Sequence, residues 1–248
     1  MIEADNVVVE KNGCIALIKI NNPPQNFLKS PAFMSMENLQ LIADDPDIKG
    51  IVISGTGRHF SAGADLENLF TMVKNSEALK HEMSAGTELL EYISELNIPV
   101  AAAIKGVCWG GGLEIAMACH IRFASTGSLF AFPEINTNLI PGLGGVVRLV
   151  KQSGNYSALS LLLSGDTVDA EKALKFNLVH QLCEENVLEQ TIKYVSNLVE
   201  SKPKKVISYV MQAIHNARKL PLHEALHEET RMFCELAIEE AVRRKSGS

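Results

Sequence analysis

Two glutamates lie in segments that are otherwise apolar, which makes them the first candidates for chemistry. Glu114 follows three glycines in "GGGLEIAMAC" (110–119), and Glu134 follows "FAFP" (130–133). Burying a carboxylate among apolar side chains costs free energy unless a partner compensates the charge. A single buried acid is more often a structural partner of an arginine or lysine. Two such acids, each beside a glycine-rich loop, favour paired acid–base catalysis.

Two loops of small residues could present backbone N–H groups to a ligand. The glycines at 110–112 precede a segment predicted to be a buried helix, and a helix N-terminus carries free N–H groups and a partial positive charge. The stretch "SAGAD" (61–65) has the same character, and Asp65 can cap the helix after it. Either loop alone could be a tight packing turn. Together they could form an oxyanion hole for a thioester or ester oxygen.

Other reaction classes find weaker support in the sequence. The stretch "GTGRHF" (55–60) lacks the third glycine of a dinucleotide-binding loop. His59 and His120 are isolated and do not have the spacing of a zinc-protease motif. Neither Ser61 nor Cys108 lies in a nucleophile-elbow pattern. We therefore expect acid–base chemistry without a metal or a covalent intermediate.

The elements that position these residues alternate between strands and helices. Short apolar runs predict strands at 14–20, 48–55, 98–106, 120–125 and 129–132. Helical spacing predicts helices within 65–96, at 157–165 and 169–177, and in two stretches of the last 45 residues, the second beginning at Pro221. The runs at 48–55 and 98–106 lack polar alternation, so their strands should be covered on both faces. The pattern predicts an α/β fold with a helical tail.

Composition excludes several functional classes. The 248 residues carry a net charge of −6, which disfavours nucleic acid as a partner. No apolar run approaches the length of a membrane span, and no secretory signal pattern begins the chain. The five cysteines are odd in number and none are two residues apart. We expect reduced thiols in a cytoplasmic protein that binds neither nucleic acid nor membrane.

Five motifs together resemble the crotonase (enoyl-CoA hydratase/isomerase) superfamily over roughly residues 5–200. They are "NPPQN" (22–26), "GRHFSAGADL" (57–66), "IKGVCWGGGLEIAMACHIRFAS" (104–125), "FPEINTNLIPGLGG" (132–145) and "LLLSGDTVDAEKALKFNLV" (161–179). The resemblance implies a crotonase-like spiral of ββα units over residues 1–195. It also implies a helical C-terminal region over 196–248 that serves as a trimerisation surface or a lid, and a homotrimer or hexamer.

The resemblance also implies roles for individual residues. Glu114 and Glu134 match the two catalytic acids, Ala64 and Gly111 match the donors of the oxyanion hole, and Gly142 matches a position that holds the catalytic water. Substrate contacts are expected at Ala62, Asp65, Leu66, Phe70 and Trp109. Coenzyme A would enter as part of an acyl-CoA thioester, with no separate cofactor.

The reaction that best fits both acids is hydration of a 2-enoyl-CoA, as in fatty acid metabolism. Glu114 would activate water and Glu134 would protonate Cα, unless the pair acts as a unit. The alternatives are an enoyl-CoA isomerase that needs mainly Glu134, a dehydratase or decarboxylase acting on an acyl carrier protein, and a catalytically weak acyl-CoA-binding protein. Three features depart from the family pattern: His120 replaces the usual aspartate, Trp109 takes the place of a smaller apolar residue before the glycines, and the closing "EKR-x-P-x-F" is missing.

Overall fold

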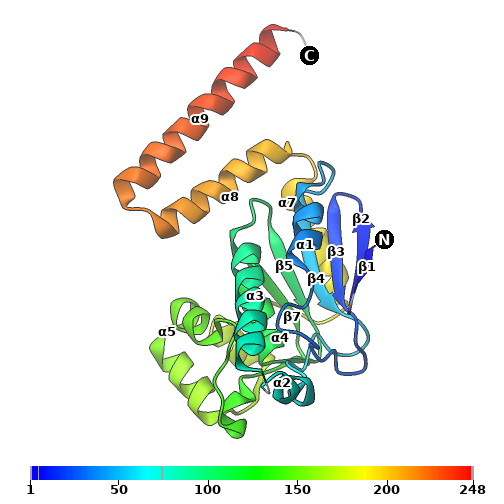
Figure 1. The fold of residues 1–248 in the computed structure, drawn as a ribbon. Helices are drawn as coiled ribbons and strands as arrows, with labels where there is room; N and C mark the ends of the chain where they lie inside the picture. The colour runs from blue at the N-terminus through cyan, green and yellow to red at the C-terminus, as the bar shows by residue number, and fades with distance from the viewer. Residues whose placement is uncertain (1, 5, 74, 247–248) are drawn as a thin grey trace.

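A twisted, mostly parallel sheet forms the centre of the computed structural model, which describes residues 2–4, 6–73 and 75–246 (Figure 1). In the described chain its strands are β1 (Ile2–Ala4), β2 (Val7–Asn12), β3 (Ile15–Ile20), β4 (Gly50–Gly55), β5 (Val100–Ile104), β7 (Ile121–Ser125) and β10 (Gln181–Cys183), in the spatial order β1-β2-β3-β4-β5-β7-β10. β1 to β3 pair antiparallel, and the pairs from β3 to β10 are parallel.

A small second sheet holds the loops that carry the candidate chemistry. It consists of β6 (Val107–Trp109), β8 (Leu129–Ala131) and β9 (Val168–Asp169), with β6 parallel to β8 and β8 antiparallel to β9. β6 leads directly into the 110–112 glycines, and β8 leads into the segment that carries Glu134. The pairing of these two strands therefore brings the two candidate acids to the same end of the sheet.

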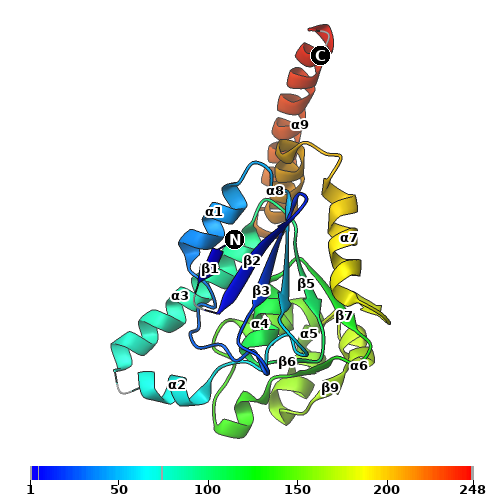
Figure 2. The same cartoon turned by 90° about the vertical axis from the view of Figure 1, so that its right-hand side faces the viewer.

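Helices cover both faces of the large sheet (Figure 2). The helices of the described ranges are α1 (Met36–Asp44), α2 (Leu66–Met72), α3 (Ser76–Glu95), α4 (Gly111–Ala118), the 3-10 helix η1 (Pro133–Thr137), α5 (Gly145–Ser164), α6 (Ala170–Lys175), α7 (Val187–Val199), α8 (Lys204–Lys219) and α9 (Leu222–Lys245). None of the helices in the described ranges has both the length and the apolar character of a membrane span.

Two apolar cores explain why the central strands lack polar alternation. Every residue of β4 and β5 is buried, as expected for strands covered on both sides. Ile51 and Ile53 face the larger core, which includes residues of α1, α3 and α4. Val52 and Ala101 face the other core, which includes residues of α7 and α8. The predicted α/β class and the predicted strands are confirmed.

The helix predicted at 157–165 corresponds to the second of two helical stretches in α5. The segment 157–165 is the second half of α5, whose first half begins at Gly145 and is separated by the non-helical Gly154 (φ 78°, ψ 169°). The helix ends as predicted, with Gly165 in the left-handed conformation that suits glycine. The helix predicted at 157–165 is therefore confirmed, whereas the stretch before the kink at Gly154 was not predicted.

The last two helices, α8 and α9, form what we call the C-terminal arm (residues 204–245). Ile207 and Met211 of α8 join the core beneath α7, whereas α9 packs on α8 and extends away from the body (Figures 1 and 2). Along α9, several large apolar side chains are exposed, namely Leu222, Leu226, Phe233, Ile238 and Val242. The predicted boundary at 195/196 falls within α7, and the arm begins at Lys204.

Candidate active site

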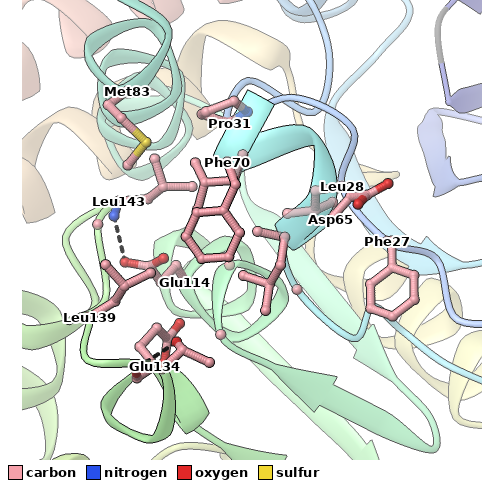
Figure 3. Close-up of a pocket in the computed structure, with 18 of the residues that line it drawn as sticks. Phe27, Leu28, Pro31, Asp65, Phe70, Met83, Glu114, Glu134, Leu139 and Leu143 are labelled. Carbon is pink, nitrogen blue, oxygen red and sulfur yellow. Dashed lines mark hydrogen bonds between the residues drawn. The ribbon is translucent and has the colours of Figure 1, made fainter. Parts of the chain in front are cut away.

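A pocket of about 820 Å³ contains both candidate glutamates (Figure 3). Its walls come from residues 27–31 and 62–67, from α2 and α3, from the glycine turn before α4, and from η1 and the turn after it. Nine residues predicted from the sequence line it: Ala62, Ala64, Asp65, Leu66, Phe70, Gly111, Glu114, Glu134 and Gly142. The fold thus brings together residues from four separate stretches of the chain.

Glu114 is fixed in the first turn of α4 and is almost fully buried, with 2% of its surface exposed. Its Oε1 accepts hydrogen bonds from the backbone N–H groups of Leu143 (Figure 3) and of Gly145, both at 2.7 Å. Burial raises the pKa of Glu114, while these two N–H groups and the charge of Arg148 lower it, leaving the pKa above its ordinary value. The carboxylate is therefore buried but supplied with specific partners.

Glu134 lies on η1 and has a different environment. Its backbone oxygen is held by Leu139 N–H at 3.0 Å, while its Oε2 is buried and lacks a hydrogen-bond partner among the described residues. Burial raises the pKa of Glu134 to about 7, and the charge of Glu114 adds to the effect. At neutral pH a large fraction of Glu134 is therefore protonated, which suits a proton donor.

The glycine at position 110 makes room for this acid. Gly110 has φ +48°, a left-handed conformation that favours glycine, and a Cβ atom there would lie 2.6 Å from Glu134 Oε1. Gly145 has a similar role on the other side, since a Cβ atom would lie 2.9 Å from Glu114 Oε1. Two of the glycines therefore admit carboxylates, a role that the sequence did not reveal.

The two glycine-rich loops meet at the backbone. A Cβ atom at Gly63 would lie 2.9 Å from Trp109 O and 3.4 Å from Gly111 N, so the loops are in direct contact. Leu28 N–H donates to Gly63 O, and Leu28 O accepts from Asp65 N–H. These two hydrogen bonds lie on either side of Ala64 and do not use its N–H group. Within the described chain, the N–H groups of Ala64 and Gly111 make no hydrogen bond. Both line the pocket as free donors.

Gly142 lies in the turn that supports Glu114. It precedes Leu143, whose N–H binds the carboxylate, and it forms part of the pocket wall beside Met83. The sequence analysis singled out Gly142 but missed Leu143 and Gly145. The only signal for them was the glycine-rich "PGLGG" itself, because the contact joins residues about thirty positions apart in the chain.

Two predicted substrate contacts have different outcomes. Asp65 lines the pocket and also caps α2 as predicted, accepting from the N–H groups of Glu67 (3.1 Å) and Asn68 (3.3 Å). Trp109 does not line the pocket, and its buried Nε1 has no hydrogen-bond partner in the described part of the chain. The expected contact between the indole and the substrate therefore finds no support in the position of the side chain.

The histidines serve the backbone outside the pocket. His59 Nδ1 accepts from Val107 N–H at 3.1 Å, and His120 Nδ1 accepts from Val100 N–H at 2.9 Å. His120, which stands where the resembled family has an aspartate, therefore retains an acceptor at that position. In the described ranges, no cluster of three or more His, Cys, Asp or Glu residues could hold a metal ion.

The chain is similar to known proteins over most of its length. A sequence model of the family described as enoyl-CoA hydratase/isomerase matches residues 10–247. A protein of Bacillus subtilis (strain 168) named "Probable enoyl-CoA hydratase" is 34% identical over 89% of this chain and 86% of its own length. The "Short-chain-enoyl-CoA hydratase" of Clostridium acetobutylicum is 32% identical over 94% and 90%. A crystal structure of an enoyl-CoA hydratase from Bacillus anthracis superposes with a TM-score of 0.83 at 28% identity, covering 97% of both chains.

Proposed function

Because the chain belongs to the enoyl-CoA hydratase/isomerase family, we propose that it adds water across the Cα=Cβ bond of a 2-enoyl-CoA thioester. The observation that carries this assignment is the pair of glutamates on one pocket in unlike environments. Glu114 accepts two backbone N–H groups, which favour its charged form, whereas burial raises the pKa of Glu134 to about 7. One acid is thereby suited to be the base and the other to be the proton donor.

The backbone donors stabilise the charge that develops on the substrate. The thioester oxygen accepts hydrogen bonds from the N–H groups of Ala64 and Gly111, which no protein group in the described chain uses. As water adds to Cβ, the electron pair of the double bond moves toward the thioester oxygen, giving enolate character. Donors aimed at such a developing oxyanion are a large source of rate enhancement.

Proton transfer follows from the two carboxyl groups. Glu114 accepts a proton from the water molecule as the bond from oxygen to Cβ forms. The enolate collapses, and Glu134 gives its proton to Cα to complete the hydroxyacyl-CoA. One proton then returns from Glu114 to Glu134 through solvent, which restores the starting state. Gly142, in the turn that supports Glu114, positions the water.

The exposed surface of the C-terminal arm favours assembly with further copies of the chain. Apolar side chains such as Phe233 (70% exposed) and Val242 (62% exposed) are left without a cover in the single chain. We propose that α8 and α9 pack on neighbouring copies in a cytoplasmic homotrimer or hexamer. Light scattering at several protein concentrations measures the mass directly, and a monomer would contradict this assembly.

Hydration of crotonyl-CoA, followed as the loss of absorbance from the conjugated thioester, tests the function. Glu114→Gln should lower kcat by about 10²- to 10⁴-fold, the usual contribution of a positioned acid or base. Glu114→Gln assayed with a 3-enoyl-CoA tests the alternative isomerase, which needs mainly Glu134 and should keep its activity in this variant. Near-normal hydration by Glu114→Gln, or isomerisation without hydration by the unmodified protein, would overturn the hydratase assignment. An acyl carrier protein thioester, assayed in parallel, tests the carrier-bound substrate.

A further inference from the structure

Arg148 holds the turn on which Glu114 depends. It lies in the first turn of α5, where its Nη1 donates a hydrogen bond of 2.6 Å to the carbonyl oxygen of Leu143. The N–H of the same Leu143 donates to Glu114 Oε1 at 2.7 Å. The guanidinium therefore binds the C=O group of Leu143, and the carboxylate binds the N–H group of the same residue. Arg148 thus constrains Leu143 in the orientation in which the Leu143 N–H points at Glu114.

The charge of Arg148 has no direct ion-pair partner. The side chain is half-buried, and none of the ion pairs found in the described ranges includes it. The titratable groups that face it are Glu114 on α4, Glu91 on α3 and the buried thiol of Cys119 at the end of α4. A partly desolvated guanidinium without a bound carboxylate is costly, which indicates that its field serves another group.

The turn is shaped around the guanidinium. Gly144 has φ +93°, in the left-handed region, and a Cβ atom there would collide with Arg148 Nη1. The adjacent Gly145 has no side chain that would strike Glu114 Oε1. One of the two consecutive glycines in "PGLGG" thus makes room for the arginine and the other for the carboxylate, which ties the two groups to a single piece of backbone.

We propose that Arg148 is a positioning residue that fixes the Leu143 peptide group and supplies the positive charge that keeps Glu114 ionised as the base. This inference rests on the proposed function. The charge of Arg148 lowers the pKa of Glu114, whereas Glu134 has no such cation among the causes of its raised pKa. The arginine thus acts on one of the two acids and separates their protonation states.

Two variants of Arg148 and one control variant separate the effect of its charge from the effect of its hydrogen bond. Arg148→Gln removes the charge, so the acid limb of kcat/KM for crotonyl-CoA should move to higher pH, with about tenfold more loss at pH 6 than at pH 8. Arg148→Lys keeps the charge but not the planar donor group, so kcat should fall while the acid limb stays in place. Lys151→Gln removes an exposed charge from the same helix and should change neither quantity.

A second readout separates this proposal from the proposed function. Infrared titration of the free protein reports protonated carboxyl groups, and the signal lost in Glu114→Gln identifies Glu114. In Arg148→Gln that signal should appear at higher pH than in the unmodified protein, whether or not hydration occurs. If Arg148→Gln does not fold, as judged by circular dichroism, Arg148→Met retains the aliphatic stem and replaces it.

The outcomes are distinct. A shifted infrared titration without hydration by the unmodified protein contradicts the proposed function alone. If the unmodified protein hydrates crotonyl-CoA, but Arg148→Gln changes neither the infrared titration of Glu114 nor the pH profile of kcat/KM, the proposed role of Arg148 is overturned. If Arg148→Gln lowers kcat equally at all pH values, Arg148 has a purely structural role, and this outcome also overturns the proposal. An acid limb that moves equally in Arg148→Lys also contradicts the proposal, because that variant keeps the charge.

Discussion

The raised pKa of Glu134 has a measurable consequence for stability. Below pH 4.5 the folded and unfolded states both hold the proton, whereas between pH 4.5 and about 7 only the folded state holds it. The folded state therefore binds more protons, and this group makes the free energy of unfolding fall as pH rises through that range. Above pH 7 both states have lost the proton and the full penalty of the buried charge remains.

The size of the effect follows from the two pKa values. Their difference of about 2.5, at 1.36 kcal/mol per unit, corresponds to about 3.4 kcal/mol, and solvent screening of the partly exposed carboxyl reduces it to about 2–3 kcal/mol. Glu134→Gln has no charge to bury. We expect the unfolding free energy of Glu134→Gln, relative to the unmodified protein, to rise by about 2–3 kcal/mol between pH 5 and pH 8.

Urea unfolding at a fixed protein concentration, followed by circular dichroism at pH 5, 6, 7 and 8, measures this difference. Glu171→Gln replaces an exposed glutamate and should give a flat difference across the same pH range. A flat difference for Glu134→Gln, or one that falls with pH, would refute the claim that burial keeps this carboxyl group protonated.

Three further outcomes are expected around the same pocket. Ala64→Pro removes a backbone N–H and should raise the barrier to hydration by at least about 2.7–4 kcal/mol, measured from kcat/KM; a folded variant with the unmodified rate would exclude Ala64 as a donor. Gly110→Ala places a methyl group 2.6 Å from Glu134 Oε1 and should lower kcat by about 10- to 10²-fold, whereas an unchanged pH–rate profile would show that Glu134 has not moved. Trp109 adjoins Gly110, so a CoA thioester should change its fluorescence and saturate at one ligand per chain; tight binding by calorimetry with unchanged emission would place the acyl site elsewhere.

The candidate acids could be found from the sequence because their signals are local. A charged residue in an apolar helix or after an apolar strand stands out within ten residues, and so does a run of glycines. The strands β4 and β5 were equally readable, since runs without polar alternation predict burial on both faces. Features that depend on residue type and spacing within one short stretch of sequence, such as these acids and strands, could therefore be predicted.

The partners of those acids could not be found in the same way. Leu143 and Gly145 reach Glu114 only because α4 and α5 pack together, and an apolar side chain gives no sign that its N–H is used. Trp109 shows the converse limit of a local signal. Its position beside the glycines suggested contact with the substrate, yet its side chain is not among those that line the pocket.

The separation of the C-terminal arm from the body also bears on synthesis of the protein. Every element that lines the pocket precedes α8 in the chain, so translation reaches the arm only after the glutamates and both glycine-rich loops have been made. At roughly 5–20 residues per second, residues 204–245 take about 2–8 s to synthesise. The exposed apolar side chains of α9 therefore emerge after the elements of the pocket, which by then have had seconds to bury their own apolar surface and are less able to trap them in a misfolded contact.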